Sequence, residues 1–195
     1  MGSLRFYLAL SVAFGHSIAY TNETFLLDAH ASVTIFFLIS GFIITYVLLK
    51  KYSDQIVLFY KNRFLRIFVP FLFIMLIIEG AYFIFGNTPR TYYILENNYS
   101  FSSTLLLFFS NIFLFGSNWV NLLENNMHEG LIIPQSWSLP IELLFYFFSP
   151  FIINAKIKKL LLFIFSLSLY LILLTLNKID FAKYLFLSNL FFFII

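Results

Sequence analysis

The chain has 195 residues, of which 61% are hydrophobic and 11% charged, with a mean hydropathy of +0.91 and a net charge of +3. Soluble domains carry about 25% charged residues, so this composition excludes a water-soluble globular domain and makes lipid the solvent for most of the surface. The chain has no cysteine, which excludes disulfides, thiolate metal sites and a cysteine-bound acyl intermediate. The sequence contains no basic run interleaved with aromatic residues, a pattern that would indicate nucleic-acid binding.

Apolar runs long enough to cross a bilayer follow one another along the chain. A spanning helix needs roughly 20 mostly apolar residues. The candidate spans are Leu4–Tyr20, Ser32–Leu49, Phe64–Phe85, Trp137–Ile153, Leu160–Leu176 and Tyr184–Ile195. The first is not typical of a signal peptide, because Gly15 and His16 interrupt its apolar core and no clear cleavage site follows. No segment shows the alternation of apolar and polar residues that is typical of barrel strands. We therefore expect an all-α, polytopic transmembrane helix bundle of about six spans, which forms a single domain over residues 1–195.

Basic residues set the expected orientation. The second connection contains Lys50, Lys51, Lys61, Arg63 and Arg66, whereas residues 21–31 contain no lysine or arginine. The positive-inside rule therefore places the N-terminus in the cytoplasm.

A second basic cluster constrains the short apolar run Thr104–Phe115. Lys156, Lys158 and Lys159 lie on the cytoplasmic side only if this run does not cross the bilayer. We therefore expect a short re-entrant or interfacial helix within a long outer segment, from about Gly86 to Ser136.

Arg5 and His16 are a pair of polar residues in the first span. Eleven residues of helix correspond to about 16 Å of rise and almost three full turns, so both side chains lie on one face. Arg5 falls at the cytoplasmic edge and His16 in the outer half, where an imidazole could transfer protons. The alternative is an arginine that reaches the headgroups and a histidine bonded to a neighbouring carbonyl.

Arg63 and Arg66 share one face where the third span begins, because they are three residues apart. Guanidinium groups bind phosphate oxygens with two parallel hydrogen bonds. The alternative is that these charges only orient the chain or bind lipid headgroups.

Glu142 lies early in the fourth span, after Ser136, Trp137, Ser138, Leu139 and Pro140. A buried glutamate could orient or charge-pair a histidine, or it could simply bond a helix end. In the second span, Gly41 allows a close approach of backbones and the Ser40 hydroxyl can bond across helices.

Counting helical rise from the ends of the spans predicts two tiers of polar groups. His16, Ser40, Glu79 and Glu142 fall in an outer tier, and Arg5, Arg63 and Arg66 at the inner edge. A donor with phosphates at one end and a reactive group on a long arm, such as acyl-CoA, fits this spacing. The three histidines have no metal-ligand spacing, so we expect no metal.

Four ordered motifs resemble the acyltransferase 3 family of membrane O-acyltransferases, which modify surface polysaccharides and other acceptors. They are Arg5-x10-His16, the run from Ile35 to Phe42 (IFFLISGF), the run from Phe59 to Ile67 (FYKNRFLRI), and the run from Ser136 to Glu142 (SWSLPIE), followed by Phe145-Tyr146 and Pro150.

The resemblance implies transfer of an acyl group, commonly acetyl from acetyl-CoA, to a glycan hydroxyl on the far side of a bacterial cytoplasmic membrane. By analogy His16 is the catalytic residue, as general base or acyl carrier, assisted by Arg5. By the same analogy Arg63 and Arg66 bind the donor, and Glu142 supports the structure of the site. Substrate or structural roles fall to Ser40, Gly41, Trp137 and Ser138.

The sequence departs from the family pattern in two respects. Ser32 and Thr34 stand where the family often has glycine and aspartate before the paired phenylalanines. Family members usually have about ten spans, and this chain has about six, so we expect a C-terminally truncated member of the family. It is a fragment of a longer gene product, a truncated pseudogene-like copy, or a half whose closing helices are supplied by a partner or another subunit. The alternative functions are a proton-coupled transporter or channel that uses intramembrane titratable groups, and an inactive or scaffold copy.

Overall fold

Every secondary-structure element in the described part of the chain is a helix. The computed structural model describes residues 2–17, 28–85, 99–117, 120, 130–153, 156–178, 182 and 185–194. Within these ranges the elements are α1 (Gly2–Ser17), α2 (Ala29–Lys50), α3 (Ile56–Ile84), α5 (Phe101–Phe113), the short 3-10 helix η2 (Pro134–Trp137), α7 (Ser138–Ile153), α8 (Lys156–Thr175) and α10 (Phe186–Ile194). The described part of the chain has no strand, which confirms the all-α helix bundle.

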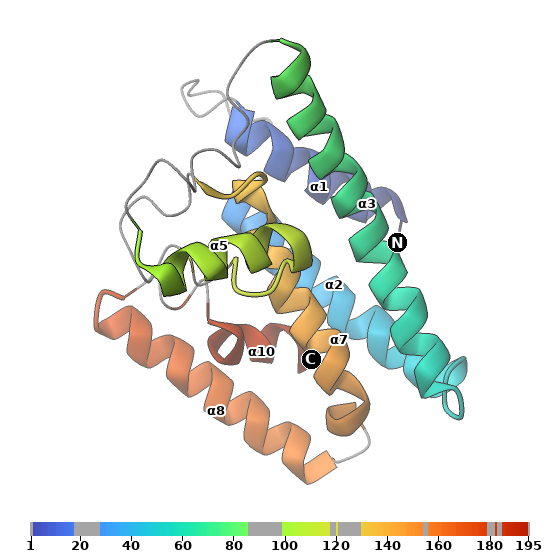
Figure 1. The fold of residues 1–195 in the computed structure, drawn as a ribbon. Coiled ribbons are helices and arrows are strands. Elements are labelled where there is room, and N and C mark those ends of the chain that lie inside the picture. Colours follow the sequence, from blue (N-terminus) through green and yellow to red (C-terminus); the bar gives the residue numbers. More distant parts are fainter. Residues whose placement is uncertain are drawn as a thin grey trace.

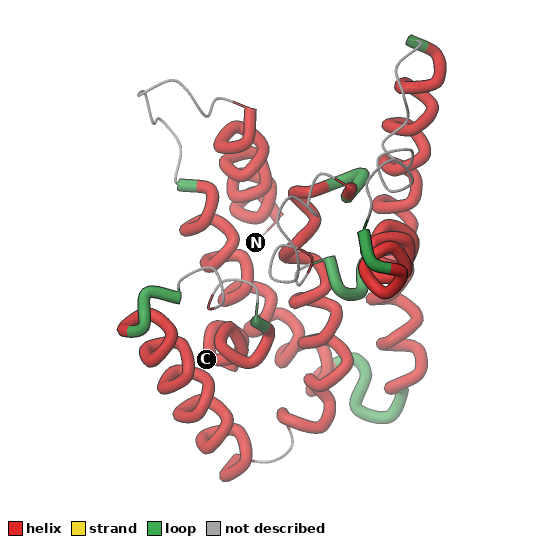
Figure 2. The backbone as a smooth tube through the Cα atoms, turned by 60° about the vertical axis from the view of Figure 1, so that its left-hand side comes forward, coloured by secondary structure: helices red, strands yellow, loops and turns green. Residues whose placement is uncertain are grey.

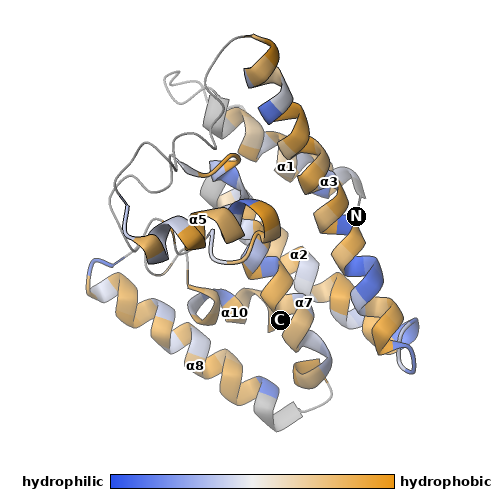
Figure 3. Ribbon diagram, in the orientation of Figure 1, coloured by the Kyte–Doolittle hydropathy of each residue, from blue (hydrophilic) through white to orange (hydrophobic). Residues whose placement is uncertain are grey.

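Three helical stretches are long and apolar enough to cross a bilayer. Among the described residues these are Ala31–Lys50, Ile56–Ile84 and Pro134–Ile153. Shorter apolar stretches occupy Ser3–Phe14, Phe101–Phe113 and Lys159–Thr175. Figure 3 shows that the outward faces of α3 and α8 are mostly hydrophobic, and Leu76 of α3 is 66% exposed. Soluble proteins rarely expose apolar surface on this scale, so these faces are suited to lipid.

The core lies where α2, α7 and α10 meet. The ring of Phe193 in α10 stacks on Phe145 of α7 with ring centroids 4.2 Å apart and lies 4.7 Å from Phe37 of α2. Gly41 of α2 faces the backbone of Phe193 so closely that a Cβ atom there would overlap the Phe193 carbonyl. The predicted close approach at Gly41 is therefore confirmed, with α10 as the neighbour.

The long helices run side by side, and α5 crosses them. Figure 1 shows α5 lying across α7 rather than along it, and the ring of Phe113 at the end of α5 lies 6.3 Å from that of Phe68 in α3. Ser100 caps its N-terminus by accepting a hydrogen bond from the Ser103 N–H, and Leu114 ends it in a left-handed conformation with φ of 63°. This crossing orientation agrees with the expected re-entrant or interfacial helix, which begins at Phe101 instead of Thr104.

The first helix starts part-way up the bundle. Figures 1 and 2 both place the beginning of α1 at about the middle height of α3, and α1 packs against α2. The prediction of two tiers of polar groups requires that α1 and α2 both cross the bilayer from one surface to the other. This difference in height decides which polar groups meet in the site.

Candidate functional site

Residues from three helices form one buried polar network in the interior of the bundle. A guanidinium nitrogen of Arg5 (α1) donates to Ser40 Oγ (α2) at 3.0 Å, and Ser40 Oγ donates to Glu142 Oε1 (α7) at 3.0 Å. The hydroxyl of Tyr146, one turn along α7, donates to the same Glu142 oxygen. Ser40 and Glu142 are 0% and 4% exposed, so this carboxylate is held by protein donors in place of water.

The network corrects the predicted separation of Ser40 and Glu142 from Arg5. The hydrogen bonds place the Arg5 guanidinium, the Ser40 hydroxyl and the Glu142 carboxylate at one level. Helical rise alone could not reveal this, because α1 begins at mid-height of the bundle. Glu79, the fourth member of the predicted outer tier, does not line the cavity described next.

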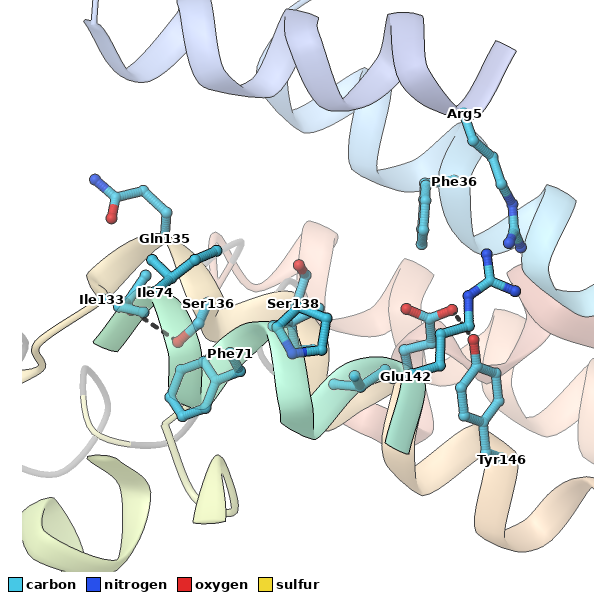
Figure 4. Close-up of a pocket in the computed structure, with 14 residues that line it drawn as sticks. Arg5, Phe36, Phe71, Ile74, Ile133, Gln135, Ser136, Ser138, Glu142 and Tyr146 are labelled. Atoms are coloured by element: carbon cyan, nitrogen blue, oxygen red, sulfur yellow. Dashed lines mark hydrogen bonds between the residues drawn. The ribbon is translucent and has the colours of Figure 1, made fainter. Parts of the chain in front are cut away.

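A cavity of about 390 Å³ opens beside this network. Its lining includes Arg5, Glu142 and Tyr146 at one end and Ile133 and Gln135 at the other (Figure 4). The complete lining is Arg5, Phe36, Arg66, Ile67, Pro70, Phe71, Ile74, Ile133, Gln135, Ser136, Ser138, Leu139, Glu142 and Tyr146. The cavity thus combines two guanidinium groups with an apolar middle section and a polar far wall.

The cavity extends in the direction of α1. In Figure 4, α1 passes above the lining residues, and the line from Glu142 to Gln135 leads from the Arg5 end of α1 toward its C-terminal end. The backbone of His16 lies in the last turn of α1. The structure does not describe the His16 side chain, so the catalytic role of His16 stays a prediction.

The two arginines of α3 have different surroundings. Arg66 is exposed and lines the cavity, together with Pro70 one turn later. Proline has no N–H to offer the carbonyl of Arg66, so this turn lacks one helical hydrogen bond beside the cavity. Arg63 is 9% exposed and lies outside the lining, with its guanidinium carbon 5.6 Å from the ring centroid of Phe59 and 5.8 Å from that of Tyr146.

The far wall of the cavity is anchored from α5. Asn111, 6% exposed, donates from Nδ2 to the Gly130 carbonyl at 2.9 Å and accepts from the Ile132 N–H at 2.9 Å. Ser136 Oγ then donates to the Ile133 carbonyl at 2.7 Å. These bonds fix the segment that leads into η2 and so position Gln135, Ser136 and Ser138 at the cavity.

Two of these residues have site roles that the sequence did not predict. Tyr146 was noted only as part of the Phe145-Tyr146 motif, although it follows Glu142 by four residues and therefore shares its helical face. Asn111 had no such signal, since its partners are backbone groups 19 and 21 residues later in the chain. Trp137, by contrast, is half-buried and packs against the main core and does not line the cavity.

Comparison with protein families decides the identity of the chain. The model of an acyltransferase domain, acyltransferase 3, matches residues 2–195. The chain belongs to the acyltransferase 3 family. No curated protein and no solved structure matches it. Together with the apolar helices, membership in the acyltransferase 3 family identifies a membrane protein of the acyltransferase class.

Proposed function

We propose that this acyltransferase moves an acyl group, acetyl in the first instance, from acyl-CoA to a hydroxyl of a glycan outside the cytoplasm. The observation that carries the proposal is the cavity, which is lined by two permanent cations, Arg5 and Arg66, and runs from its Arg5 end along α1 toward the turn that contains His16. Family membership supports acyl transfer in general. The donor, the acceptor and the roles of individual residues are our inference.

The cation end of the cavity suits the phosphates of coenzyme A. Arg66 and Arg5 both line it, and a guanidinium keeps its charge in an apolar setting, where charge-assisted bonds to phosphate are strong. The apolar lining of Phe71 and Ile74 suits an extended arm. Such a donor would direct its thioester along α1, away from the arginines.

His16 is the proposed proton acceptor or acyl carrier at the other end. It lies about 16 Å of helical rise from Arg5, which matches a donor with phosphates and thioester at opposite ends of a long arm. As general base, the imidazole would take the proton of the acceptor hydroxyl while the hydroxyl oxygen attacks the thioester carbonyl. The carbon–sulfur bond would then break and coenzyme A would leave as the thiol. As acyl carrier, it would first accept the acyl group and then pass it to the hydroxyl.

Replacement of His16 tests the proposal. We expect His16→Ala to lower transfer of radiolabelled acetyl from acetyl-CoA to the surface polysaccharide of the producing cells by about 10²- to 10⁴-fold at matched protein level. His30→Ala is the matched control, because it removes another histidine, in the first turn of α2, and should leave transfer unchanged. Transfer that persists in His16→Ala would remove His16 from the mechanism, and wild-type protein without transfer would reject the donor and acceptor proposed.

A further inference from the structure

Arg63 faces aromatic rings instead of the cavity. It is only 9% exposed, and its guanidinium carbon lies within 6 Å of the ring centroids of Phe59 and Tyr146. Its Nε is buried without a hydrogen-bond partner among the described residues. A buried cation requires compensation, and the electron-rich faces of these rings supply part of it.

Tyr146 connects this cation to the polar network. One face of its ring lies near Arg63, while its hydroxyl donates to Glu142 Oε1. Tyr146 is 4% exposed and also lines the cavity, as Figure 4 shows. A shift of the ring would therefore move the hydroxyl away from the carboxylate that faces the cavity.

We propose that Arg63 is a positioning residue that acts on the site through Tyr146 and does not bind the donor. The cation fixes the tyrosine ring, the ring aims its hydroxyl at Glu142, and Glu142 is thereby held against Ser40, which in turn bonds Arg5. This inference rests on the proposed function, because it assigns the two arginines of α3 different tasks in the same site. Arg66 contacts the donor and Arg63 fixes the geometry of the cavity wall.

The two tasks predict different kinetic effects. We expect Arg66→Met to raise KM for acetyl-CoA by about 10-fold or more, and Arg63→Met to lower kcat by about 10-fold with KM within about 2-fold of wild type. Lys61→Met is the matched control, since Lys61 is an exposed cation of α3 that does not line the cavity, and should change neither. A rise in KM in Arg63→Met as large as that in Arg66→Met would overturn the proposal.

A double-mutant cycle tests whether Arg63 acts through the tyrosine hydroxyl. Tyr146→Phe keeps the ring and removes the hydroxyl that reaches Glu142. In this background Arg63→Met should change kcat by less than about 2-fold, whereas Arg66→Met should still raise KM in full. Effects of Arg63→Met and Tyr146→Phe on kcat that simply multiply would show that the two residues act independently and would refute the proposal.

Measurements without turnover separate this inference from the proposed function. If wild-type protein transfers no acetyl, equilibrium binding of coenzyme A still distinguishes the arginines, because Arg66→Met should lose affinity and Arg63→Met should keep it. If wild-type protein binds no coenzyme A, the proposed function fails. The contact between Arg63 and the Tyr146 ring is then tested by thermal unfolding of wild type, Arg63→Met, Tyr146→Leu and the double variant. Additive shifts of the unfolding midpoint would then refute the contact, and coupled shifts would support it.

Discussion

The hydroxyl of Ser40 lies between two charged side chains that belong to different helices. It accepts from Arg5 and donates to Glu142, so a single small side chain satisfies a cation on α1 and an anion on α7. The Ser40 side chain is fully buried, at 0% exposure. Removing its hydroxyl therefore takes one hydrogen bond from Arg5 and one from Glu142, which keeps its bond from Tyr146.

We expect Ser40→Ala to lower the free energy of unfolding by about 1–3 kcal/mol, since the half-buried Arg5 guanidinium and the buried Glu142 oxygen each lose a hydrogen bond. Thermal or detergent-induced unfolding of the purified protein measures this change. Ser53→Ala is the control, because the Ser53 hydroxyl bonds Asp54 at the exposed α2–α3 connection and should contribute little. Equal effects of the two substitutions would contradict a specific role for the buried hydroxyl.

At the scale of single residues, the sequence identified most members of the site but not their partners. Arg5, Ser40, Glu142 and Arg66 were all predicted, and the structure brings all four to one cavity or its adjoining network. Ser40 and Glu142 are 102 positions apart, and no local pattern encodes a contact at that separation. Contacts of this kind depend on how the helices pack, which composition and spacing do not specify.

At the scale of elements, two glycines in similar apolar helices have opposite surroundings. A Cβ at Gly41 would overlap the backbone of Phe193, whereas a Cβ at Gly80 in α3 would meet nothing within 4 Å. The first glycine permits α2 and α10 to approach closely. The second only lowers helix propensity.

We expect Gly41→Ala to destabilise the fold by about 1–3 kcal/mol, because α2 and α10 must separate. Gly80→Ala should be neutral or stabilise by up to about 1 kcal/mol through helix propensity alone. Unfolding midpoints of the two variants, measured side by side, provide the comparison. Stabilisation by Gly41→Ala would show that α10 does not pack against α2 at this position.

Helix positions were largely predictable from apolar runs, while helix ends and heights were not. The third helix begins at Ile56, eight residues before the predicted Phe64, because the polar stretch from Lys61 to Asn62 continues the helix. An apolar run does not include the charged residues before it, although lysine and arginine are good helix formers. The height of α1 is not predictable for a different reason, since apolar length says nothing about where a helix starts relative to its neighbours.

At the scale of the whole molecule, α3 sets the expected position in the bilayer. Its 29 residues correspond to about 43 Å of rise, more than the roughly 30 Å of hydrocarbon, so both ends should reach the interfaces. Val57 and Phe83 lie near these ends and are 83% and 81% exposed. The proposed cytoplasmic N-terminus would place Val57 inside and Phe83 outside.

The absence of native cysteine makes this orientation directly testable. In intact cells, a membrane-impermeant maleimide should label Phe83→Cys and not Val57→Cys, and permeabilised cells should label both. Wild-type protein is the background control, since it has no thiol. Labelling of both sites in intact cells, or of Val57→Cys alone, would reject the orientation on which the proposed direction of transfer depends.

The anchor that Asn111 provides has a consequence for the cavity wall of this chain. Its amide bonds main-chain groups, the Gly130 carbonyl and the Ile132 N–H, so the anchor does not depend on the side chains that follow. Exchanges at Ile133 or Gln135, which line the cavity, would therefore change the shape of the cavity while these two bonds stay in place. If the proposed function holds, this stretch is where substitutions would alter which acceptor fits.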